Sequence, residues 1–350
     1  MTEQKSTPSP LRFGIVGCGV IGQTHAAAVS SLSDAELVGV ADVVPERARA
    51  LAGAYGVAAY PDLTSMLAAA DIDVVTISTA SGLHGEQAEE AMRAGKHVIV
   101  EKPLEITLPA IDHLLHIQRE AGVKLAVISQ HRYDPAARQV HESIAAGALG
   151  TLVLANAHIL WWRSQEYYDS GEWRGTWALD GGGVLMNQSI HSIDLLQWFM
   201  GPVRSVSAYT GTLAHRMETE DTAVAALRFE SGALGSISAT TTAYPGVGTR
   251  LEILGSEGSA VIADDRLSYL HLKREGGHDV GPYGLETRER PQSGSQEPEG
   301  DAHMLQIEDI IREIRRNGTP MVDGEAARHD VAIILAIYES ARTGREVVLE

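Results

Sequence analysis

The sequence predicts an α/β protein with a parallel-sheet domain followed by an α+β domain built on a large, mostly antiparallel open sheet. Its 350 residues exceed what one compact core usually serves. Strand-like and helix-like segments alternate through the first third, and strands with few helices follow after about residue 150. We expect a disordered tail at 1–10, a first domain at 11–128 and a second at 129–350 for substrate binding and oligomerisation, with the alternative that the closing helices pack back on the first.

The first domain is predicted from short apolar runs, each followed by a helical pattern. Alternation at this spacing indicates βαβ units and therefore a parallel sheet. Pro45 stands at the first position of the second helix, where its missing N–H is tolerated. The expected strands are Leu11–Val16, Leu37–Ala41, Val74–Ser78, His97–Val100 and Leu125–Ser129. The expected helices are Val20–Leu32, Pro45–Tyr55, His84–Ala94 and Leu108–Ala121.

The second domain is predicted from strand-like runs separated by turn residues such as Ser231-Gly232. The segment Gly276–Gly300 is rich in Gly, Pro, Ser and charge, so we expect an exposed loop there. The expected strands are Thr151–Leu160, Val203–Gly211, Thr222–Glu230, Ala233–Ala243, Arg250–Leu254 and Ser259–Ala263. The expected helices are Ile190–Met200, after the glycine run Gly181–Gly183, and the closing pair His303–Arg316 and Ala326–Thr343.

Charge and composition exclude several classes of protein. The formal net charge is −18 and the sequence has no Lys/Arg-rich run, so no nucleic-acid partner is expected. No apolar run approaches the ~18 residues of a membrane span, and Met1–Pro10 lacks the apolar stretch of a secretory signal. The single cysteine, Cys18, indicates a reducing compartment and predicts a cytoplasmic protein. No Cys/His cluster has zinc spacing, so no metal is expected.

The segment Gly17–Gly22 matches G-x-G-x-x-G, and it follows a predicted strand and opens a predicted helix. The first glycine permits the tight turn, the second lets the backbone approach a pyrophosphate, and the third allows close packing of helix and strand. A diphosphate would lie at the helix N-terminus, where free N–H groups favour an anion. This context predicts a Rossmann domain, against the alternative of a glycine-rich turn without ligand. The predicted cofactor contacts are Gly17, Gly19, Val20, Ile21 and Gly22.

The residue at the end of the second strand distinguishes NAD from NADP. Asp42 stands there, and its carboxylate would accept both ribose hydroxyls of NAD. A 2′-phosphate would meet like charge at this position, although Arg47 could offset it. NAD is therefore favoured and NADP stays possible. The alternative role for Asp42 is a turn or a helix N-cap before Pro45.

The run Ala94–Leu104, with Glu101-Lys102-Pro103 at its centre, resembles the glucose–fructose oxidoreductase/inositol dehydrogenase family (Gfo/Idh/MocA). The resemblance extends from Gly17 to Arg345. It implies an NAD(P)-dependent sugar or polyol dehydrogenase, which moves a hydride between the nicotinamide and a secondary hydroxyl, or the matching ketone. The substrate would be a sugar, anhydrosugar, nucleotide-sugar or cyclitol. The open sheet face of the second domain suggests a homodimer or homotetramer.

The resemblance also implies roles for single residues. Lys102 matches the family's lysine beside the nicotinamide and the reacting carbon, and His191 matches its acid/base histidine. Asn187 lies four residues before His191, on the same helix face. Further cofactor-side positions are Thr79, His84, Glu101 and the pair Trp173-Arg174. The predicted substrate contacts are Lys102, Asn187 and His191 with Gln130, Arg132, Tyr133 and Arg163.

One position departs from the inositol dehydrogenase branch, which has aspartate where this chain has Asn187. An aspartate would hold an imidazolium and raise its pKa, whereas a neutral amide cannot, so Asn187 would rather orient a substrate hydroxyl. Asn-Gln-x-x-His together with Trp173–Trp177 resembles sugar and nucleotide-sugar oxidoreductases more than inositol dehydrogenases.

Hydride transfer from a secondary alcohol requires a base for the hydroxyl proton and a group that stabilises alkoxide charge. His191 titrates near neutrality and is the first choice for the proton carrier. Lys102 would stabilise the alkoxide and lower the pKa of the histidine, and the two roles could be exchanged. Asp194 could assist His191 or could face another partner of the helix. Without the resemblance, a packed histidine and an ordinary strand-end lysine would be the simpler interpretations.

Other functions on the same fold stay open. One is an NAD-dependent glycosidase or lyase that oxidises its substrate transiently, and another is a non-catalytic cofactor-sensing regulator. An aldehyde or imine reductase suits the Asn/His pairing less well. A set of aromatic residues could be core or dimer packing, or could line a sugar pocket: Trp161, Trp162, Tyr167, Tyr168, Trp173 and Trp177.

Overall fold

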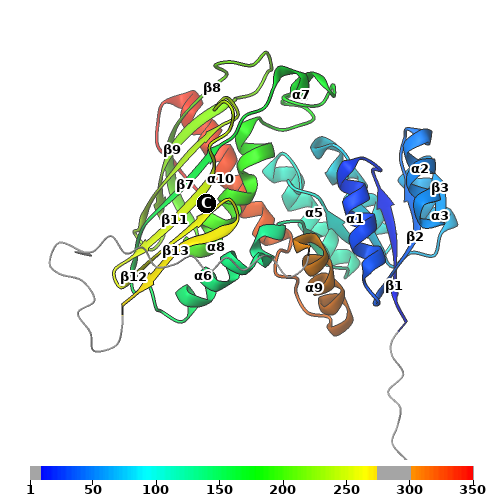
Figure 1. Ribbon diagram of the computed structural model, residues 1–350. Helices are drawn as coiled ribbons and strands as arrows, with labels where there is room; N and C mark the ends of the chain where they lie inside the picture. The colour runs from blue at the N-terminus through cyan, green and yellow to red at the C-terminus, as the bar shows by residue number, and fades with distance from the viewer. Residues whose placement is uncertain (1–8, 274–300, 350) are drawn as a thin grey trace, which may run out of the picture. The chain divides into compact units, whose positions relative to one another are not determined.

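The structure is a computed structural model that describes residues 9–273 and 301–349 (Figure 1). By its internal contacts the chain divides into two units. Unit 1 comprises Met1–Ile128 and Gly300–Ala327, and unit 2 comprises Ser129–Glu299 and Arg328–Glu350. Apart from Ser9 and Pro10, the expected tail lies outside the described residues, and so does the expected loop Gly276–Gly300.

Unit 1 contains a six-stranded sheet in the order β3-β2-β1-β4-β5-β6, and every neighbouring pair is parallel. The predicted parallel sheet is therefore confirmed, and the short strand β3 was not predicted. The chain moves outward from β1 to β3 and then returns to the other side of β1, which makes the ends of β1 and β4 the topological switch point. The strands are β1 (Leu11–Val16), β2 (Ala35–Ala41), β3 (Ala58–Tyr60), β4 (Val74–Ile77), β5 (His97–Val100) and β6 (Leu125–Val127).

Local signals mark the ends of two helices of unit 1. Pro45 opens α2, which ends at Gly56 with a left-handed φ of 69°. Asp62 accepts the N–H of Ser65 at 2.7 Å and so caps α3, a helix that was not predicted. The helices are α1 (Val20–Ser31), α2 (Pro45–Tyr55), α3 (Leu63–Ala69), α4 (His84–Arg93), α5 (Leu108–Ala121) and α9 (Ala302–Arg316).

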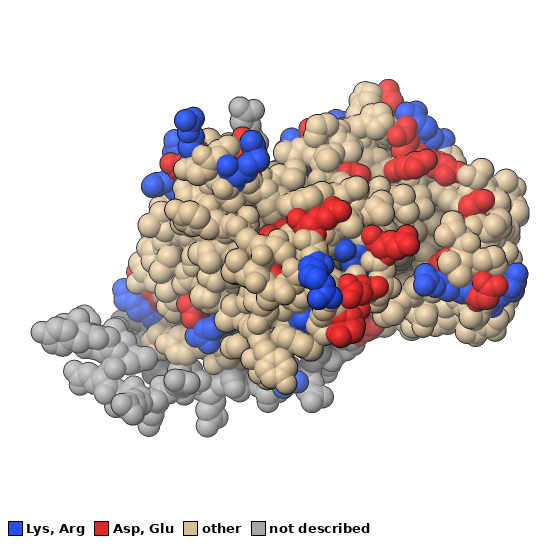
Figure 2. All heavy atoms as spheres, turned by 90° about the horizontal axis from the view of Figure 1, so that it is seen from above, with Lys and Arg blue, Asp and Glu red and all other residues tan. Residues whose placement is uncertain are grey.

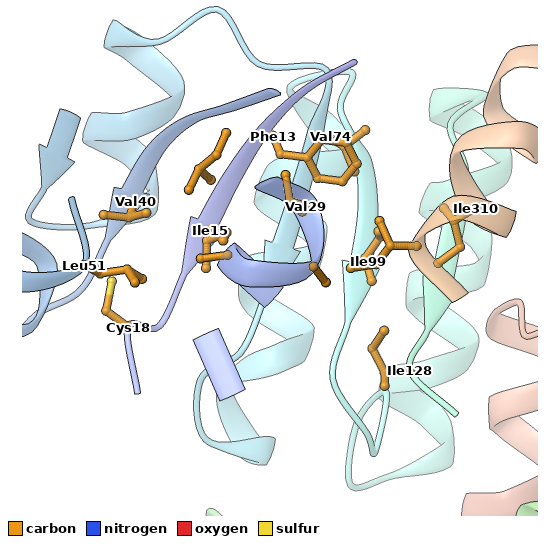
Figure 3. Packing of buried hydrophobic residues seen from close by; sticks show 14 of the residues in the cluster. Phe13, Ile15, Cys18, Val29, Val40, Leu51, Val74, Ile99, Ile128 and Ile310 are labelled. Carbon is orange, nitrogen blue, oxygen red and sulfur yellow. The ribbon is translucent and has the colours of Figure 1, made fainter. Parts of the chain in front are cut away.

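One apolar core joins the sheet of unit 1 to its covering helices (Figure 3). Phe13 and Ile15 of β1 and Val29 of α1 are completely buried in it. Ile310 of α9 packs into the same core, so this late helix belongs to the first unit. Each fully buried side chain of this size contributes about 1.5–3 kcal/mol of transfer free energy. The C-terminal half of α1 is therefore held firmly against the sheet.

Unit 2 contains an eight-stranded sheet in the order β13-β12-β11-β7-β10-β9-β8-β14. All neighbouring pairs are antiparallel except β7–β10, which is parallel. This confirms the predicted mostly antiparallel sheet. Strands β13 and β14 were not predicted. The strands are β7 (Leu152–Leu160), β8 (Val203–Gly211), β9 (Thr222–Phe229), β10 (Leu234–Thr240), β11 (Gly248–Gly255), β12 (Gly258–Ala263), β13 (Arg266–Leu272) and β14 (Val347–Val348).

Residues along β9 alternate between buried and exposed, which is the pattern of a sheet with one covered face. Helix α8 packs on β7 and β11. The helices of this unit are α6 (Pro135–Ala145), α7 (Gln165–Asp169), α8 (Ile190–Met200) and α10 (Gly324–Thr343), whose first turn belongs to unit 1. Among helices in the described ranges, none is long and apolar enough to cross a bilayer. Acidic and basic side chains are interspersed on the face drawn in Figure 2.

Candidate active site

The glycine loop between β1 and α1 has little room for side chains on its inner side. Gly17 has a φ of 90°, and a Cβ there would lie 2.5 Å from the carbonyl oxygen of Ser78. A Cβ at Gly22 would lie 1.9 Å from the carbonyl oxygen of Gly17. At Gly19, by contrast, a Cβ would meet nothing within 4 Å, so the space over the loop is open. Since no side chain caps α1, its first N–H groups can receive a diphosphate, and the loop fits a dinucleotide.

Asp42 has the turn role that the sequence left as one alternative, and it also contacts the glycine loop. Its Oδ1 accepts the N–H of Val44 at 2.8 Å, as in a turn, and its Oδ2 accepts the N–H of Cys18 at 2.8 Å. The carboxylate is therefore fixed beside the glycine loop, and each oxygen keeps capacity for a ribose hydroxyl. Arg47 is exposed in the first turn of α2. Burial raises the pKa of the Cys18 thiol to about 12, so this residue is no nucleophile at neutral pH.

Lys102 is half-buried directly after β5, and the residue before it holds its backbone. Glu101 is buried, and its Oε2 accepts the N–H of Lys102 at 3.2 Å. Its Oε1 lies 2.9 Å from Nε2 of His25 on α1. Burial raises the pKa of Glu101, but the bond to His25 and the charges of His25, Lys102 and His303 together outweigh this and leave the pKa below its usual range. Glu101, predicted as a cofactor contact, thus joins the cofactor helix to the Lys102 backbone.

His84 and Thr79, also predicted on the cofactor side, brace the same loop. His84 is buried, with Nδ1 2.7 Å from the oxygen of Pro103 and Nε2 3.2 Å from the oxygen of Thr79. Burial lowers the pKa of His84, so the ring is neutral at neutral pH. Thr79 Oγ1 donates to Gln87 Oε1 at 2.7 Å. A neutral imidazole carries one N–H and so donates to only one of these carbonyl oxygens, the nearer being that of Pro103, and this bond favours a supporting role.

In unit 2 a π-helical turn, Val184–Ser189, precedes α8 and carries Asn187. The glycines before it are required by close neighbours, because a Cβ at Gly183 would lie 1.8 Å from the oxygen of Glu220. The Glu220 carboxylate accepts the N–H groups of Gly183 at 3.0 Å and Leu185 at 2.9 Å, and the hydroxyl of Tyr338 at 2.9 Å. Burial raises the pKa of Glu220 to about 7. Glu220 and Tyr338 had no signal in the sequence and would be found only through this fold.

Asn187 and His191 occupy the start of the helical segment, as predicted, and both are half-buried. Asn187 Nδ2 donates to Oδ1 of the buried Asp180 at 2.7 Å, and its Oδ1 accepts from Gln188 Nε2 at 3.0 Å. The amide is therefore held in one orientation. The imidazole of His191 packs edge to face on that of His131, with ring centroids 5.1 Å apart.

Two predicted substrate contacts have internal positions instead. Arg132 and Tyr133 are buried, and the Arg132 guanidinium forms hydrogen bonds with Asp194. Asp194 also accepts the Ser129 hydroxyl, so it faces this segment and its role beside His191 is not supported. Gln130 is half-buried, and its Nε2 lies 3.4 Å from His131 Nε2.

His131 was not singled out in the sequence, although it lies among the predicted contacts. Its Nδ1 is 2.7 Å from Asp134 and 3.5 Å from Asp265. Each of these three residues offers one atom that could bind a metal ion, and these atoms lie within 4.8 Å of one another. Sequence spacing could not reveal this grouping. A proton on Nδ1 shared with Asp134 accounts for the geometry without an ion.

Some of the aromatic residues are buried and others are exposed. Tyr168 is buried and donates to Thr241 Oγ1 at 2.9 Å, as core packing requires. Trp162 and Trp177 are 39% and 47% exposed. Arg163 and Arg174 both stack on Tyr167, and Arg174 also stacks on Trp173.

Two family models match this chain. Residues 11–129 match an oxidoreductase family with an NAD-binding Rossmann fold, and residues 137–261 match the GFO/IDH/MocA C-terminal domain. The chain belongs to the GFO/IDH/MocA family. Membership confirms the resemblance that the sequence showed, the predicted fold and the prediction of an NAD-binding oxidoreductase.

Several relatives of this family member have known activities or bound ligands. Inositol 2-dehydrogenase of Rhizobium meliloti is 31% identical over 278 residues, which cover 78% of this chain and 81% of the relative. The WlbA dehydrogenase of Bordetella pertussis, solved with NADH and UDP-GlcNAcA, has a TM-score of 0.86 and 36% identity over 97% of this chain and 99% of its own. Levoglucosan dehydrogenase with NADH and levoglucosan has a TM-score of 0.86 and 26% identity over 98% and 100% of the two chains.

Proposed function

We propose that this oxidoreductase is a dehydrogenase that uses NAD to oxidise a secondary hydroxyl of a sugar or nucleotide-sugar, or to reduce the matching ketone. The proposal assigns Lys102, His191 and Asn187 to the chemistry. The observation that carries it is the bracing of the segment before His191: Glu220 holds its backbone and Asp180 holds the Asn187 amide. Such bracing suits side chains that must meet a reacting hydroxyl in one geometry.

NAD, when bound at the glycine loop, supplies the hydride acceptor. The residues of the chain must then manage the hydroxyl proton and the charge that develops on oxygen. Neutral His191 accepts the proton, and the Lys102 ammonium stabilises the alkoxide. The Asn187 amide, already oriented by Asp180 and Gln188, positions the hydroxyl. Lys102 and His191 could exchange these two roles, since strongly coupled groups share their titration.

The cofactor preference rests on Asp42. Its carboxylate is fixed by two backbone N–H groups beside the glycine loop. A ribose with free hydroxyls can donate to it, whereas a 2′-phosphate would bring like charge to a group that cannot move away. Arg47 is exposed in the neighbouring helix, where its positive charge could offset this repulsion, so NADP stays possible.

The substrate preference rests on Asn187 and on the exposed aromatic side chains. An amide at this position suits a hydroxyl of a sugar, and the exposed rings of Trp162 and Trp177 can cover the C–H face of a pyranose. The WlbA dehydrogenase, whose structure holds a nucleotide-sugar, is more similar in sequence to this chain than the inositol dehydrogenase is. We therefore place sugars and nucleotide-sugars before cyclitols.

Two accompanying properties are part of the proposal. Exposed apolar residues on β8, β9 and β10, namely Tyr209, Val224 and Leu234, would be covered in a homodimer or homotetramer. Cys18 is buried with a free thiol, which suits the reducing cytoplasm. Light scattering that shows only monomer would contradict the first property.

The decisive test measures NADH formation by absorbance across monosaccharides, anhydrosugars, inositols and UDP-sugars, with NAD and NADP in parallel. The assignment is supported if one compound yields NADH and if Lys102→Ala and His191→Ala each lower this rate by a factor of about 10² or more. Lys96→Ala and His158→Ala serve as matched controls, because they remove the same side chains from positions with no assigned role. If no compound yields NADH although calorimetry shows that NAD binds, the result would instead favour a lyase that retains its cofactor or a cofactor sensor.

A further inference from the structure

Two arginines of unit 2 place their guanidinium groups against one aromatic ring. The guanidinium carbon of Arg174 lies 4.4 Å from the ring centroid of Tyr167, and that of Arg163 lies 5.3 Å from the same centroid. Arg174 Nη1 also donates to the Tyr167 hydroxyl at 2.7 Å. Two positive charges therefore lie against the ring of Tyr167 in α7.

The same pair is connected to the proposed catalytic segment. Gln188 Nε2 donates to the Tyr167 hydroxyl at 2.9 Å, and Gln188 Oε1 accepts from Arg163 Nη2 at 3.0 Å. Gln188 also donates to the neighbouring Asn187 at 3.0 Å. A group bound by the two arginines would thus lie beside the residue that orients the substrate hydroxyl.

Among the residues that the structure describes, no carboxylate oxygen lies within 4.0 Å of a guanidinium nitrogen of Arg163 or Arg174. This is unusual in a chain with 46 acidic and 28 basic residues. Arg132, in the same unit, pairs with Asp194. The Nε of Arg163 is moreover buried without an acceptor in the described part of the chain. A charge held in this way is costly unless a counter-charge arrives from outside.

The backbone of Arg163 is fixed before any ligand binds. Its N–H donates to the oxygen of Thr241 at 2.9 Å, and its carbonyl accepts from His215 Nε2 at 2.9 Å. His215 is anchored in turn by Asp221, 3.2 Å from its Nδ1. The guanidinium stacks on Trp161, 5.0 Å from that ring centroid, as well as on Tyr167. The Arg163 side chain is therefore already ordered, and little conformational entropy is lost when a ligand binds to it.

We propose that Arg163 and Arg174 form an anion subsite that receives a carboxylate or phosphate group of the sugar substrate. The proposal rests on the proposed function and narrows its substrate class to acidic sugars or nucleotide-sugars, against neutral sugars and inositols. A guanidinium matches both anions because its planar N–H fork donates two parallel hydrogen bonds to a pair of oxygens. Arg163 already donates Nη1 to the oxygen of Trp162 at 3.2 Å and Nη2 to Gln188, so the anion would be received by the remaining N–H of each of these two nitrogens and by the edge of Arg174.

Isothermal titration calorimetry of the NADH-loaded protein tests the subsite with glucose, glucuronate, UDP and UDP-glucuronate as probes. We expect at least one anionic probe to bind ten times more tightly than glucose, a factor of about the size of one charge-assisted hydrogen bond. Glucuronate reports on a carboxylate and UDP on a diphosphate. Arg163→Gln and Arg174→Gln should each remove this advantage, while Arg163→Lys should keep part of it.

Arg250→Gln is the matched control, because Arg250 on β11 is paired with Glu252 and carries no part of the subsite. Thermal unfolding identifies any variant that fails to fold, and Arg174→Gln then replaces Arg163→Gln as the informative change. Anionic probes that bind no better than glucose, or equally well to both glutamine variants, would overturn the subsite.

Turnover and calorimetry separate this inference from the proposed function. Arginine-dependent anion binding without NADH formation from any sugar would keep the subsite and overturn the dehydrogenase. Oxidation of an acidic sugar or nucleotide-sugar that is undiminished in both glutamine variants would keep the dehydrogenase and overturn the subsite.

Discussion

The carboxylate of Glu220 accepts the backbone N–H of Gly183 at 3.0 Å, across a sequence separation of 37 residues. The backbone oxygen of Glu220 also accepts the N–H of Val184 at 2.9 Å. Glu220, two residues before β9, therefore fixes the first turn of the helical segment that carries Asn187 and His191. At Gly183 this contact leaves no room for a Cβ.

Gly183→Ala should displace that turn. The added Cβ would meet the backbone oxygen of Glu220 at 1.8 Å, and backbone cannot move aside as a flexible side chain can. We expect a loss of about 1–3 kcal/mol in the free energy of unfolding. We also expect a fall of tenfold or more in kcat, with the Kd of NADH unchanged because the glycine loop lies in the other unit.

The matched control is Gly53→Ala in α2, where a Cβ would meet nothing within 4 Å. This variant should be slightly more stable, by about 0.5–1 kcal/mol, since alanine favours a helix interior. Equal kcat values for the two alanine variants would show that the turn at Gly183 does not position the catalytic residues.

Glu220 should also make stability depend on pH. Its pKa rises from 4.5 to about 7 on folding because it is buried, so the folded protein holds the proton more tightly than the unfolded chain. The resulting stabilisation is complete below the unfolded pKa and is lost as pH rises through the folded one. Between pH ~4.5 and ~7 we expect the unfolding free energy to fall by up to about 3 kcal/mol from this group.

Chemical denaturation of the wild type and Glu220→Gln at several pH values measures this contribution. The difference between the two proteins should change with pH in the stated direction, because glutamine does not titrate. Parallel pH profiles would mean that the carboxyl does not exchange its proton with an altered pKa in the folded protein.

Local signals predicted the elements that position the cofactor. The apolar run Leu11–Val16, the glycine motif and the helix from Val20 are contiguous in sequence, and the structure has each of them where expected. Strand β14 could not be predicted in this way, because Val347–Val348 becomes a strand only by pairing with β8. Likewise, the parallel pairing of β7 with β10 depends on the order of the whole sheet.

The same contrast between local and long-range features holds for the candidate site. Lys102, Asn187 and His191 lie within recognisable motifs, whereas His25 and Glu220, which hold Glu101 and Gly183 beside them, come from distant segments. Arg132 shows the limit, since its position beside Gln130 predicted a substrate contact and its buried pairing with Asp194 depends on α8. A charged side chain close in sequence to a site is no guide to whether its head group faces the site or the core.

His131 should influence the pH dependence of turnover through its contact with His191. Burial alone would lower the pKa of His131, but Asp134, Asp265 and Asp194 together raise it above its usual value. Its ring is therefore cationic over more of the neutral range and lies against His191, where like charge opposes a second imidazolium. His131→Asn should move the acid limb of the kcat/KM profile to higher pH, by about half a unit to one unit.

Asp134→Asn should shift the profile in the same direction, because Asp134 raises the pKa of His131 and without this carboxylate the His131 ring is neutral over more of the pH range. His158→Asn on β7 is the control and should leave the profile in place. A profile unchanged in the first two variants would remove His131 from the reaction. Activity lost with a chelator and restored by a divalent cation would show that a metal, and not a proton, joins these residues.

Asp42→Asn should lower the affinity for NAD more than that for NADP. The amide oxygen can still accept one of the two backbone N–H groups of Cys18 and Val44, so the loop keeps part of its support while the negative charge is gone. We expect the Kd of NAD to rise about tenfold through weaker hydrogen bonds to the ribose, and that of NADP to change little or to fall. Calorimetry with both cofactors measures the two values on one preparation. Equal losses for NAD and NADP would mean that Asp42 acts only by shaping the glycine loop, and the preference for NAD would then need another cause.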